Sequence, residues 1–166
     1  MTKAKKLIQQ LQLQPHPEGG WYRQSYKSEG YIPAGSLPIG FRGKRAFSTL
    51  IYFLLEKGEF SGFHRIKSDE CWHFYTGDPM ELFILDNQGG VKTIILGNEG
   101  LEEPHFQFVV PADFWFACRP AAGSEYCLTG CTVAPGFEFA DFELADADDL
   151  VSKYPAHEKL IRELCV

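Results

Sequence analysis

His64 and Glu70 are the two residues whose types and spacing best indicate chemistry in this chain of 166 residues. They lie within residues 58–77, GEFSGFHRIKSDECWHFYTG, where a Ser-Asp-Glu turn separates two turn-free stretches. The pattern predicts a strand, a tight turn and a second strand, so that the two side chains meet across a hairpin. A histidine and a glutamate held together in this way can move a proton on a bound substrate.

Strand alternation predicts which neighbours share a pocket with this pair. If His64 points into the protein, Glu70 on the next strand does so too, provided that neither strand contains a bulge. Trp72 and Phe74 then form the pocket wall, and His73 points outward. Because an aromatic wall disfavours the charged form of a carboxyl group, we expect the pKa of Glu70 to be raised.

The remainder of the chain predicts an all-β domain that positions this hairpin. Short strands, about ten in number and separated by turns rich in Gly and Pro, indicate an antiparallel sandwich or barrel. In addition to the hairpin, strands are expected at residues 21–26, 47–55, 80–85, 91–96, 106–110, 115–118, 126–133 and 137–142. The chain is predicted to be a single domain, residues 1–166.

Helices are expected only at the two ends of the chain. Residues 1–14 carry Leu and Ile on one helical face and predict an N-terminal helix capped by Thr2. Residues 18–143 are assigned to the β domain. Residues 146–165 predict C-terminal helical segments, with Asp146 as the cap of the first.

Residues 27–45 predict a long loop, of the kind that often serves as a lid or a partner-binding arm. Its basic residues are Arg42, Lys44 and Arg45. We interpret them as ordinary solvated charge, with contact to an anionic ligand as the alternative. His16 and His157 lie beside prolines and are expected to be exposed.

Composition excludes several classes of protein. A net charge of −6 gives no basic footprint for nucleic acid, although residues 1–66 carry +6 and residues 67–166 carry −12. We interpret the acidic part as a solvated face, with self-association between oppositely charged patches as the alternative. The five cysteines lack a C-x-x-C pair and predict free thiols in a reducing compartment. With neither a signal-peptide pattern nor an apolar run of membrane-spanning length, a cytoplasmic protein without membrane contact is expected.

The stretch at 58–77 resembles the first motif of the cupin superfamily, G-x5-H-x-H-x3,4-E-x6-G. Gly58, His64, Glu70 and Gly77 occupy its anchor positions, and Ile66 stands where the motif has its second histidine. The resemblance implies a double-sheet jelly-roll barrel, with the short N-terminal helix and the C-terminal helical segments attached to it.

The resemblance also raises the question of a metal. In metal-binding cupins a further histidine comes from a second motif, and its closest match here, P-x-D-x-x-F at residues 111–116, has Phe116 in that place. Ile66 and Phe116 therefore leave His64 and Glu70 alone, too few for a transition metal, which normally takes three or more protein ligands. We expect no resident cofactor, with a divalent metal held by His64, Glu70 and His73, or by His105 in place of His73, as the alternative.

A closer resemblance extends over nearly the whole chain. It rests on P-E-G-G-x-Y at 17–22, F-H-R at 63–65, D-E-x-W-H-F-Y-x-G-D-P at 69–79, V-P at 110–111 and G-C-T-V-A-P-G-F at 130–137. Together these segments resemble the small single-domain branch called the cupin-5 family. The resemblance implies a homodimer with a pocket at the barrel mouth, and it brings no assigned reaction.

Three functions remain open on this basis. The first is a metal-independent isomerase or epimerase acting on a sugar-like or carbonyl-bearing small molecule, with His64 and Glu70 as catalytic residues. The second is a protein that binds or senses a small molecule without turnover, and the third is a metal-dependent enzyme with an incomplete ligand set. Further candidate contacts with the ligand are Arg23 for an anionic group, Tyr52 and Tyr126 as tyrosine partners, and Trp115.

Overall fold

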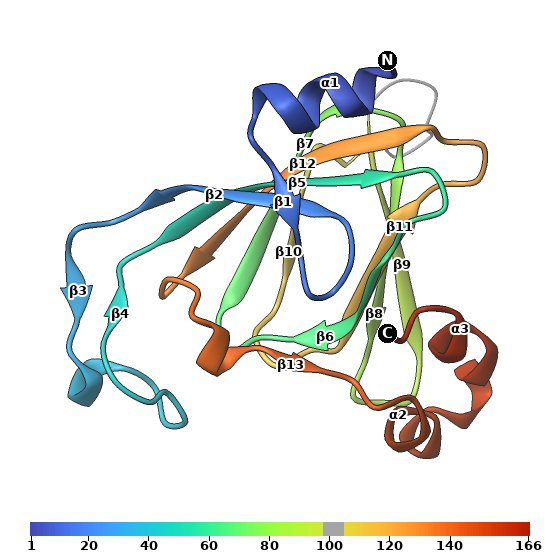
Figure 1. Cartoon of the computed structure of the whole chain (residues 1–166). Coiled ribbons are helices and arrows are strands. Elements are labelled where there is room, and N and C mark those ends of the chain that lie inside the picture. The colour runs from blue at the N-terminus through green and yellow to red at the C-terminus, as the bar shows by residue number, and fades with distance from the viewer. Residues whose placement is uncertain (98–104) are drawn as a thin grey trace.

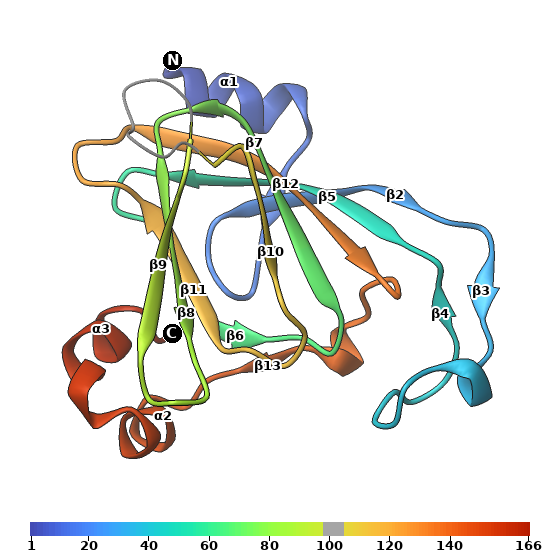
Figure 2. The same cartoon turned by 180° about the vertical axis from the view of Figure 1, so that it is seen from behind.

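The computed structural model describes residues 1–97 and 105–166. Two antiparallel sheets face each other, and a small two-stranded arm extends from one end (Figures 1 and 2). This architecture confirms the expected double-sheet jelly roll with short helices at both ends.

The first sheet has six strands in the order β1-β2-β5-β12-β7-β10. Their bounds are Gln14–Pro15, Trp21–Lys27, Thr49–Glu56, Tyr126–Ala134, Asp69–Gly77 and Gln107–Val110. The second sheet has five strands in the order β13-β6-β11-β8-β9. Their bounds are Glu143–Leu144, Ser61–Arg65, Phe116–Pro120, Met80–Leu85 and Val91–Leu96. The arm pairs β3, Tyr31–Ile32, with β4, Arg45–Ala46.

The space between the sheets is filled by side chains that alternate inward from both layers. Because successive side chains of a strand point to opposite faces, β7 contributes Trp72 and Phe74 to this core, while Tyr75 is exposed on the outer face. Phe53 and Phe116 meet the indole of Trp72 edge-on from β5 and β11. The aromatic core therefore joins the two sheets.

Helices cover the outer faces, where the sheets would otherwise expose apolar side chains (Figure 1). Helix α1, Lys3–Gln10, begins at Thr2, whose hydroxyl accepts a hydrogen bond from the Lys5 N–H, and packs on the six-stranded sheet. Helices α2, Ala147–Lys153, and α3, Glu158–Glu163, pack on the five-stranded sheet. No helix within 1–97 or 105–166 is long and apolar enough to cross a membrane.

Two expectations about the strands are wrong. The strands around His64 and Glu70 form as predicted, but β6 and β7 do not pair with each other, because β6 joins the five-stranded sheet and β7 the six-stranded sheet. Residues 137–142 do not form a strand: a 3-10 turn at Phe139–Asp141 follows Pro135, and the short strand β13 comes after it. His64 and Glu70 thus approach each other across the interior of the sandwich.

The arm is held to the body by a buried ion pair. Arg45 is 3% exposed, and its Nε and Nη2 donate to the two carboxylate oxygens of Asp141 at 2.6 and 2.7 Å. Its Nη1 donates to the carbonyl oxygens of Arg42, Gly43 and Lys44. The interpretation of Arg45 as solvated loop charge is therefore wrong, since its guanidinium closes the loop and anchors it.

This pair leads to a prediction for stability. Asp141→Asn leaves the Arg45 charge buried without a counter-ion, and we expect a loss of about 3 kcal/mol in the free energy of unfolding, measured by urea titration. The matched control is Glu125→Gln, which breaks an exposed pair with Lys57 at 2.8 Å and should leave the free energy of unfolding nearly unchanged. Equal effects of the two variants would contradict an anchoring role for Arg45.

Candidate functional site

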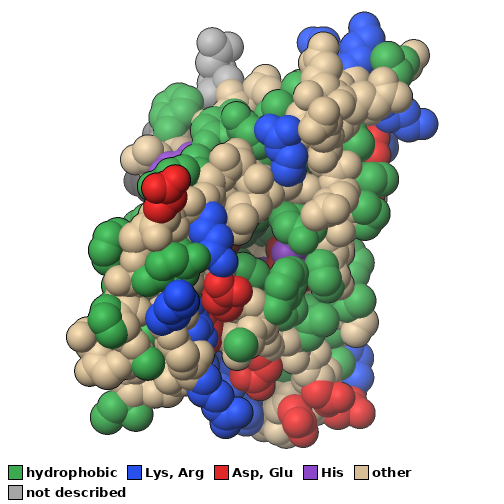
Figure 3. All heavy atoms as spheres, turned by 60° about the vertical axis from the view of Figure 1, so that its left-hand side comes forward, with side chains coloured by type: hydrophobic (Ala, Val, Ile, Leu, Met, Phe, Trp, Pro, Cys, Tyr) green, Lys and Arg blue, Asp and Glu red, His purple; other side chains and the backbone are tan. Residues whose placement is uncertain are grey.

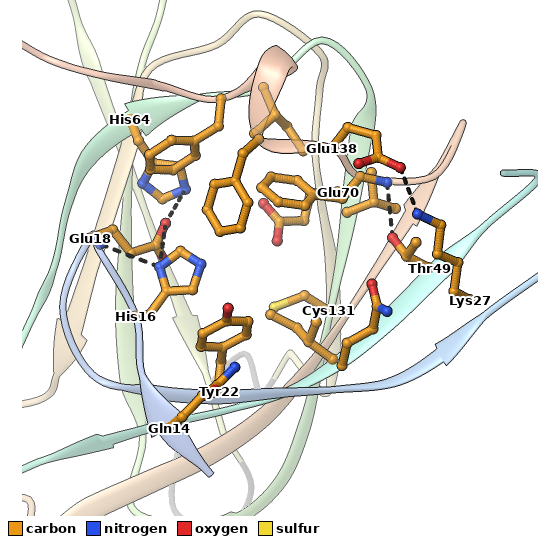
Figure 4. Close-up of a pocket in the computed structure, with 17 residues that line it drawn as sticks. Gln14, His16, Glu18, Tyr22, Lys27, Thr49, His64, Glu70, Cys131 and Glu138 are labelled. Atoms are coloured by element: carbon orange, nitrogen blue, oxygen red, sulfur yellow. Dashed lines mark hydrogen bonds and ion pairs between the residues drawn. The ribbon is translucent and has the colours of Figure 1, made fainter. Parts of the chain in front are cut away.

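A cavity of about 290 Å³ opens between the two sheets, and its lining includes His16, Glu18, His64 and Glu70. The surface view shows a hollow with histidine and acidic side chains at its base and hydrophobic side chains around it (Figure 3). The polar lining consists of Gln14, His16, Glu18, Tyr22, Gln24, Lys27, Thr49, His64, Glu70, Cys131 and Glu138 (Figure 4). The apolar lining consists of Ile51, Ile66, Val133, Phe137, Phe139 and Phe142.

A bulge in β6 brings two polar residues of that strand into the interior. Along β11, Phe116 and Cys118 both face the core, and their partners on β6 are His64 and Ser61, so β6 contains one extra residue. The ring of His64 packs on Phe116 at 4.2 Å between centroids, and its Nδ1 lies 2.7 Å from the carbonyl oxygen of Gly62. Because a carbonyl oxygen only accepts, Nδ1 carries a proton and Nε2 is directed at the cavity side.

The loop between β1 and β2 supplies the carboxyl group that faces His64. Gly19 and Gly20 have φ of 112° and 73°. A Cβ at Gly19 would clash with the carbonyl oxygen of Phe60, so only glycine fits there. This close return lets the Glu18 carbonyl accept from the Gly62 N–H at 2.8 Å. The same turn directs the side chains of His16 and Glu18 into the cavity (Figure 4).

Glu18 is the centre of a buried hydrogen-bonded network. Its Oε1 accepts from the hydroxyl of Ser61 at 2.8 Å, and its Oε2 lies 3.2 Å from Nε2 of His64 and 3.6 Å from Nδ1 of His16. Burial raises the pKa of Glu18, against smaller lowering by His16 and Ser61. Burial also lowers the pKa of His64, against smaller raising effects of Glu70 and of the Gly62 carbonyl. Both directions favour an uncharged pair, in which the protonated Glu18 carboxyl donates a hydrogen bond to His64 Nε2.

Glu70 extends from β7 on the opposite sheet and is 7% exposed. Burial raises its pKa to about 7, the neighbouring His64 lowers it and Glu18 raises it again. The thiol of Cys131 and the indole N–H of Trp72 lower it less. Trp72 Nε1 makes no hydrogen bond of normal geometry within the described part of the chain. We therefore attribute its lowering of the Glu70 pKa to the dipole of the indole N–H group. Glu70 therefore exchanges a proton near neutral pH, in accordance with the expected rise of its pKa.

The structure brings together only part of the predicted site. His64 and Glu70 line one cavity, whereas Trp72 and Phe74 lie in the core behind it and are absent from its lining. Their roles in binding stay predictions.

The other candidate contacts lie at separate places. Tyr52 and Tyr126 pack under helix α1, and Arg23 reaches Gln12 at 3.4 Å from the same outer face. Trp115 lies on the opposite outer side, where the guanidinium of Arg65 sits 4.5 Å from its ring centroid. The structure does not bring these four residues to the cavity that contains His64 and Glu70.

The residues of the cavity do not fit a metal centre. Within the described ranges, no group of three or more His, Cys, Asp and Glu side chains is arranged to hold a metal ion. His73 faces outward as predicted, and its two ring nitrogens lie 2.9 Å from Thr132 Oγ1 and 3.2 Å from Gln107 Nε2. His64 uses one ring nitrogen on Gly62 and the other on Glu18, so neither is free for coordination.

Sequence reasoning missed most of the cavity lining, including its ionisable or phenolic residues His16, Glu18 and Tyr22. The expectation that His16 is exposed is wrong, since its side chain is only 6% exposed. The signal was the Gly-Gly pair directly after Glu18, because two residues with positive φ fold a loop sharply back onto the body. That signal predicts a turn, but the strand that the turn contacts is distant in sequence.

Comparison with known proteins agrees with this geometry. The model of the Cupin_5 family, described as "Cupin superfamily (DUF985)", matches residues 5–145. The chain belongs to this family.

Solved structures and a curated relative extend the match. Protein SO0799 from Shewanella oneidensis is 35% identical with a TM-score of 0.88, covering 100% of this chain and 99% of that one. A hypothetical protein from Leishmania major is 30% identical with a TM-score of 0.86, covering 99% of both chains. Uncharacterized protein YML079W from Saccharomyces cerevisiae is 25% identical, covering 95% of this chain and 83% of its own. None of these names states an activity.

The raised pKa of Glu70 predicts how stability depends on pH. The folded-state value of about 7 exceeds the ordinary value of 4.5, so folded protein binds an extra proton between these values and loses stability as pH rises through them. Glu70→Gln removes this loss, and the variant should gain about 3 kcal/mol relative to the parent between about pH 5 and pH 8. Urea unfolding across this range measures the difference. Parallel curves for the two proteins would contradict the raised pKa, and Glu125→Gln serves as the control.

Proposed function

We propose that this cupin-5 protein is a proton-transfer enzyme of the isomerase or epimerase class. Its substrate is a small polar molecule with a carbonyl group, and Glu70 and the His64–Glu18 pair carry the protons. The observation on which this rests is a carboxyl group with a pKa of about 7 that faces an enclosed cavity, with a second buried acid–base pair beside it. A proton carrier is most effective when its pKa lies near the working pH.

The positions of the two carriers suit removal and return of a proton. Glu70 comes from the six-stranded sheet, and the carboxyl group of Glu18 is held by His64 of the five-stranded sheet, so a molecule between the sheets has a carboxyl carrier on each side (Figure 4). The Glu70 carboxylate takes the proton of a carbon next to a carbonyl, and the electron pair of the C–H bond becomes an enolate. The carboxyl group of Glu18, in its pair with His64, gives its proton to the enolate and becomes a carboxylate, while Glu70 holds the proton taken from carbon; proton exchange with water restores Glu18 and Glu70. These steps use side chains of this chain alone.

The size and lining of the cavity support a sugar-like substrate. A volume of about 290 Å³ is at the lower end for small-molecule sites. Gln14, Gln24 and Thr49 line it with groups that bind hydroxyls, and Phe137 and Phe142 cover one side. Lys27 and Glu138 pair at 2.6 Å and are both partly exposed, which locates them at the opening. Any nucleotide attached to such a sugar would extend past this opening into solvent.

The test is exchange of carbon-bound hydrogen with solvent. Protein is incubated in D₂O with a panel of aldoses, ketoses and 2-oxo acids, and deuterium incorporation is followed by proton NMR. We expect incorporation next to the carbonyl of at least one compound. Glu70→Gln should reduce the rate by about 10²-fold or more, which is the usual contribution of a positioned acid–base group.

Glu125→Gln is the matched control, because its carboxyl lies on the surface away from the cavity, paired with Lys57, and it should keep the parent rate. Exchange that continues unchanged in Glu70→Gln would overturn the assignment of the carrier. Compounds that raise the melting temperature without any exchange would instead favour the binding protein without turnover. Exchange that disappears with chelator and returns with a divalent metal would favour the metal-dependent enzyme.

A further inference from the structure

We propose that His16 and Tyr22 form a two-donor site that binds one oxygen atom of the ligand, and that this oxygen belongs to an uncharged carbonyl group. The site lies in the same cavity as Glu70. Its role in turnover rests on the proposed function, whereas its role in binding a ligand is independent of that proposal.

The first observation is the hydrogen bond that sets the tautomer of His16. The backbone N–H of Glu18 donates to Nδ1 of His16 at 3.3 Å. An N–H donor requires an acceptor, so Nδ1 bears a lone pair and the ring hydrogen is on Nε2. The same side of the ring faces Glu18 Oε2 at 3.6 Å, beyond hydrogen-bonding distance. His16 is therefore a fixed donor through Nε2.

The second observation is where that donor points. The His16 side chain is 6% exposed, yet Nε2 makes no hydrogen bond to any residue of the described ranges, and it is directed into the open part of the cavity (Figure 4). Because Nε2 borders the cavity, an acceptor oxygen of a bound ligand can take the hydrogen bond of this N–H in place of water. Burial lowers the pKa of His16, Glu18 raises it by a smaller amount, and His64 lowers it further. The ring is thus an uncharged donor at neutral pH.

The third observation is a second donor at the same place. The ring of Tyr22 meets that of His16 edge-on, with centroids 4.5 Å apart and planes at 84°. This packing fixes both rings, and the Tyr22 hydroxyl points into the cavity beside His16 (Figure 4). Two rigid donors that converge on one space match the two lone pairs of a single oxygen.

The surroundings define which oxygen fits. Glu18 and Glu70 both line this cavity, so a ligand carboxylate placed here would meet two groups that can bear negative charge. A ketone, aldehyde or amide-like carbonyl has no such penalty. When a neighbouring C–H bond loses its proton, that oxygen gains negative charge, and fixed donors aimed at it stabilise the enolate. The geometry thus favours an uncharged carbonyl in the ground state.

The first experiment determines the tautomer of His16 and needs no ligand. Histidine labelled with ¹⁵N is followed by NMR through two-bond couplings to the ring carbon protons, and the His16 signals are identified by their loss in His16→Asn. We expect the Nε2–H tautomer, uncharged at pH 7, since burial lowers the pKa of His16. An Nδ1–H tautomer or an imidazolium at pH 7 would overturn the proposal.

The second experiment measures binding of a matched pair of probes by calorimetry in the presence of EDTA. Glycolohydroxamate offers an uncharged carbonyl oxygen, and glycolate offers a carboxylate. We expect the hydroxamate to bind more tightly than glycolate and to shift the His16 Nε2–H resonance. His16→Asn, whose amide oxygen can still accept from the Glu18 N–H, and Tyr22→Phe should each weaken hydroxamate binding about tenfold.

Control variants are His157→Asn and Tyr31→Phe, which lie outside the cavity and should leave affinity unchanged. Absence of hydroxamate binding, tighter binding of glycolate, or equal affinity in His16→Asn and the parent would each overturn the inference. Failure of the proposed function is a different result, namely no solvent exchange while the tautomer and the probe binding are as expected. In that case the cavity is a carbonyl-binding site without turnover.

Discussion

The contact between the Glu18 loop and strand β6 is the interaction on which the site depends. It combines a backbone hydrogen bond from Gly62 to Glu18, the Ser61 hydroxyl on one carboxyl oxygen and His64 Nε2 on the other. A buried carboxyl group is tolerated only when its oxygens are partnered, and here β6 provides both partners. The bulge that turns Ser61 and His64 to the same side makes this arrangement available. Without it, the strand would present one of these residues to the interior and the other to the outer face.

Burial then sets the direction in which the pKa of each ionisable residue in the cavity is shifted. The same removal from water raises the pKa values of Glu18 and Glu70 and lowers those of His16 and His64. Each shift favours the uncharged form of its group, and the pKa of Glu70, at about 7, lies where a carboxyl group can both take and give a proton at neutral pH. The raised pKa of Glu70 lowers the free energy of unfolding at neutral pH. Functional sites commonly combine such destabilising groups with well-packed surroundings. The aromatic core of Phe53, Trp72 and Phe116 provides such surroundings here.

Much of the fold could be predicted from the sequence. Strands β8 and β9 begin and end at the predicted residues, Thr2 and Asp146 cap the helices as expected, and the alternation on β7 places Trp72 inward and His73 outward. These features depend on nearest neighbours in the chain and on a period of two or 3.6 residues. The pairing of β6 with β7 was wrong because local pattern identifies strands without specifying which sheet each joins. Arg45 was misjudged because its partner Asp141 lies 96 residues away.

For the site, the sequence alone determined that His64 and Glu70 lie on two consecutive strands and that Glu70 shares a strand face with Trp72 and Phe74. Strand periodicity is sufficient for those statements, and the resemblance to the cupin motifs implied that Ile66 and Phe116 leave a metal set incomplete. Only the tertiary structure decided that His16, Glu18 and Tyr22 share the cavity with them, and that Arg23, Tyr52, Tyr126 and Trp115 lie elsewhere. The physical reason is that a bulge, a pair of glycines and the stacking of two sheets set these distances. Such distances depend on how remote segments pack, and no local pattern in the sequence records them.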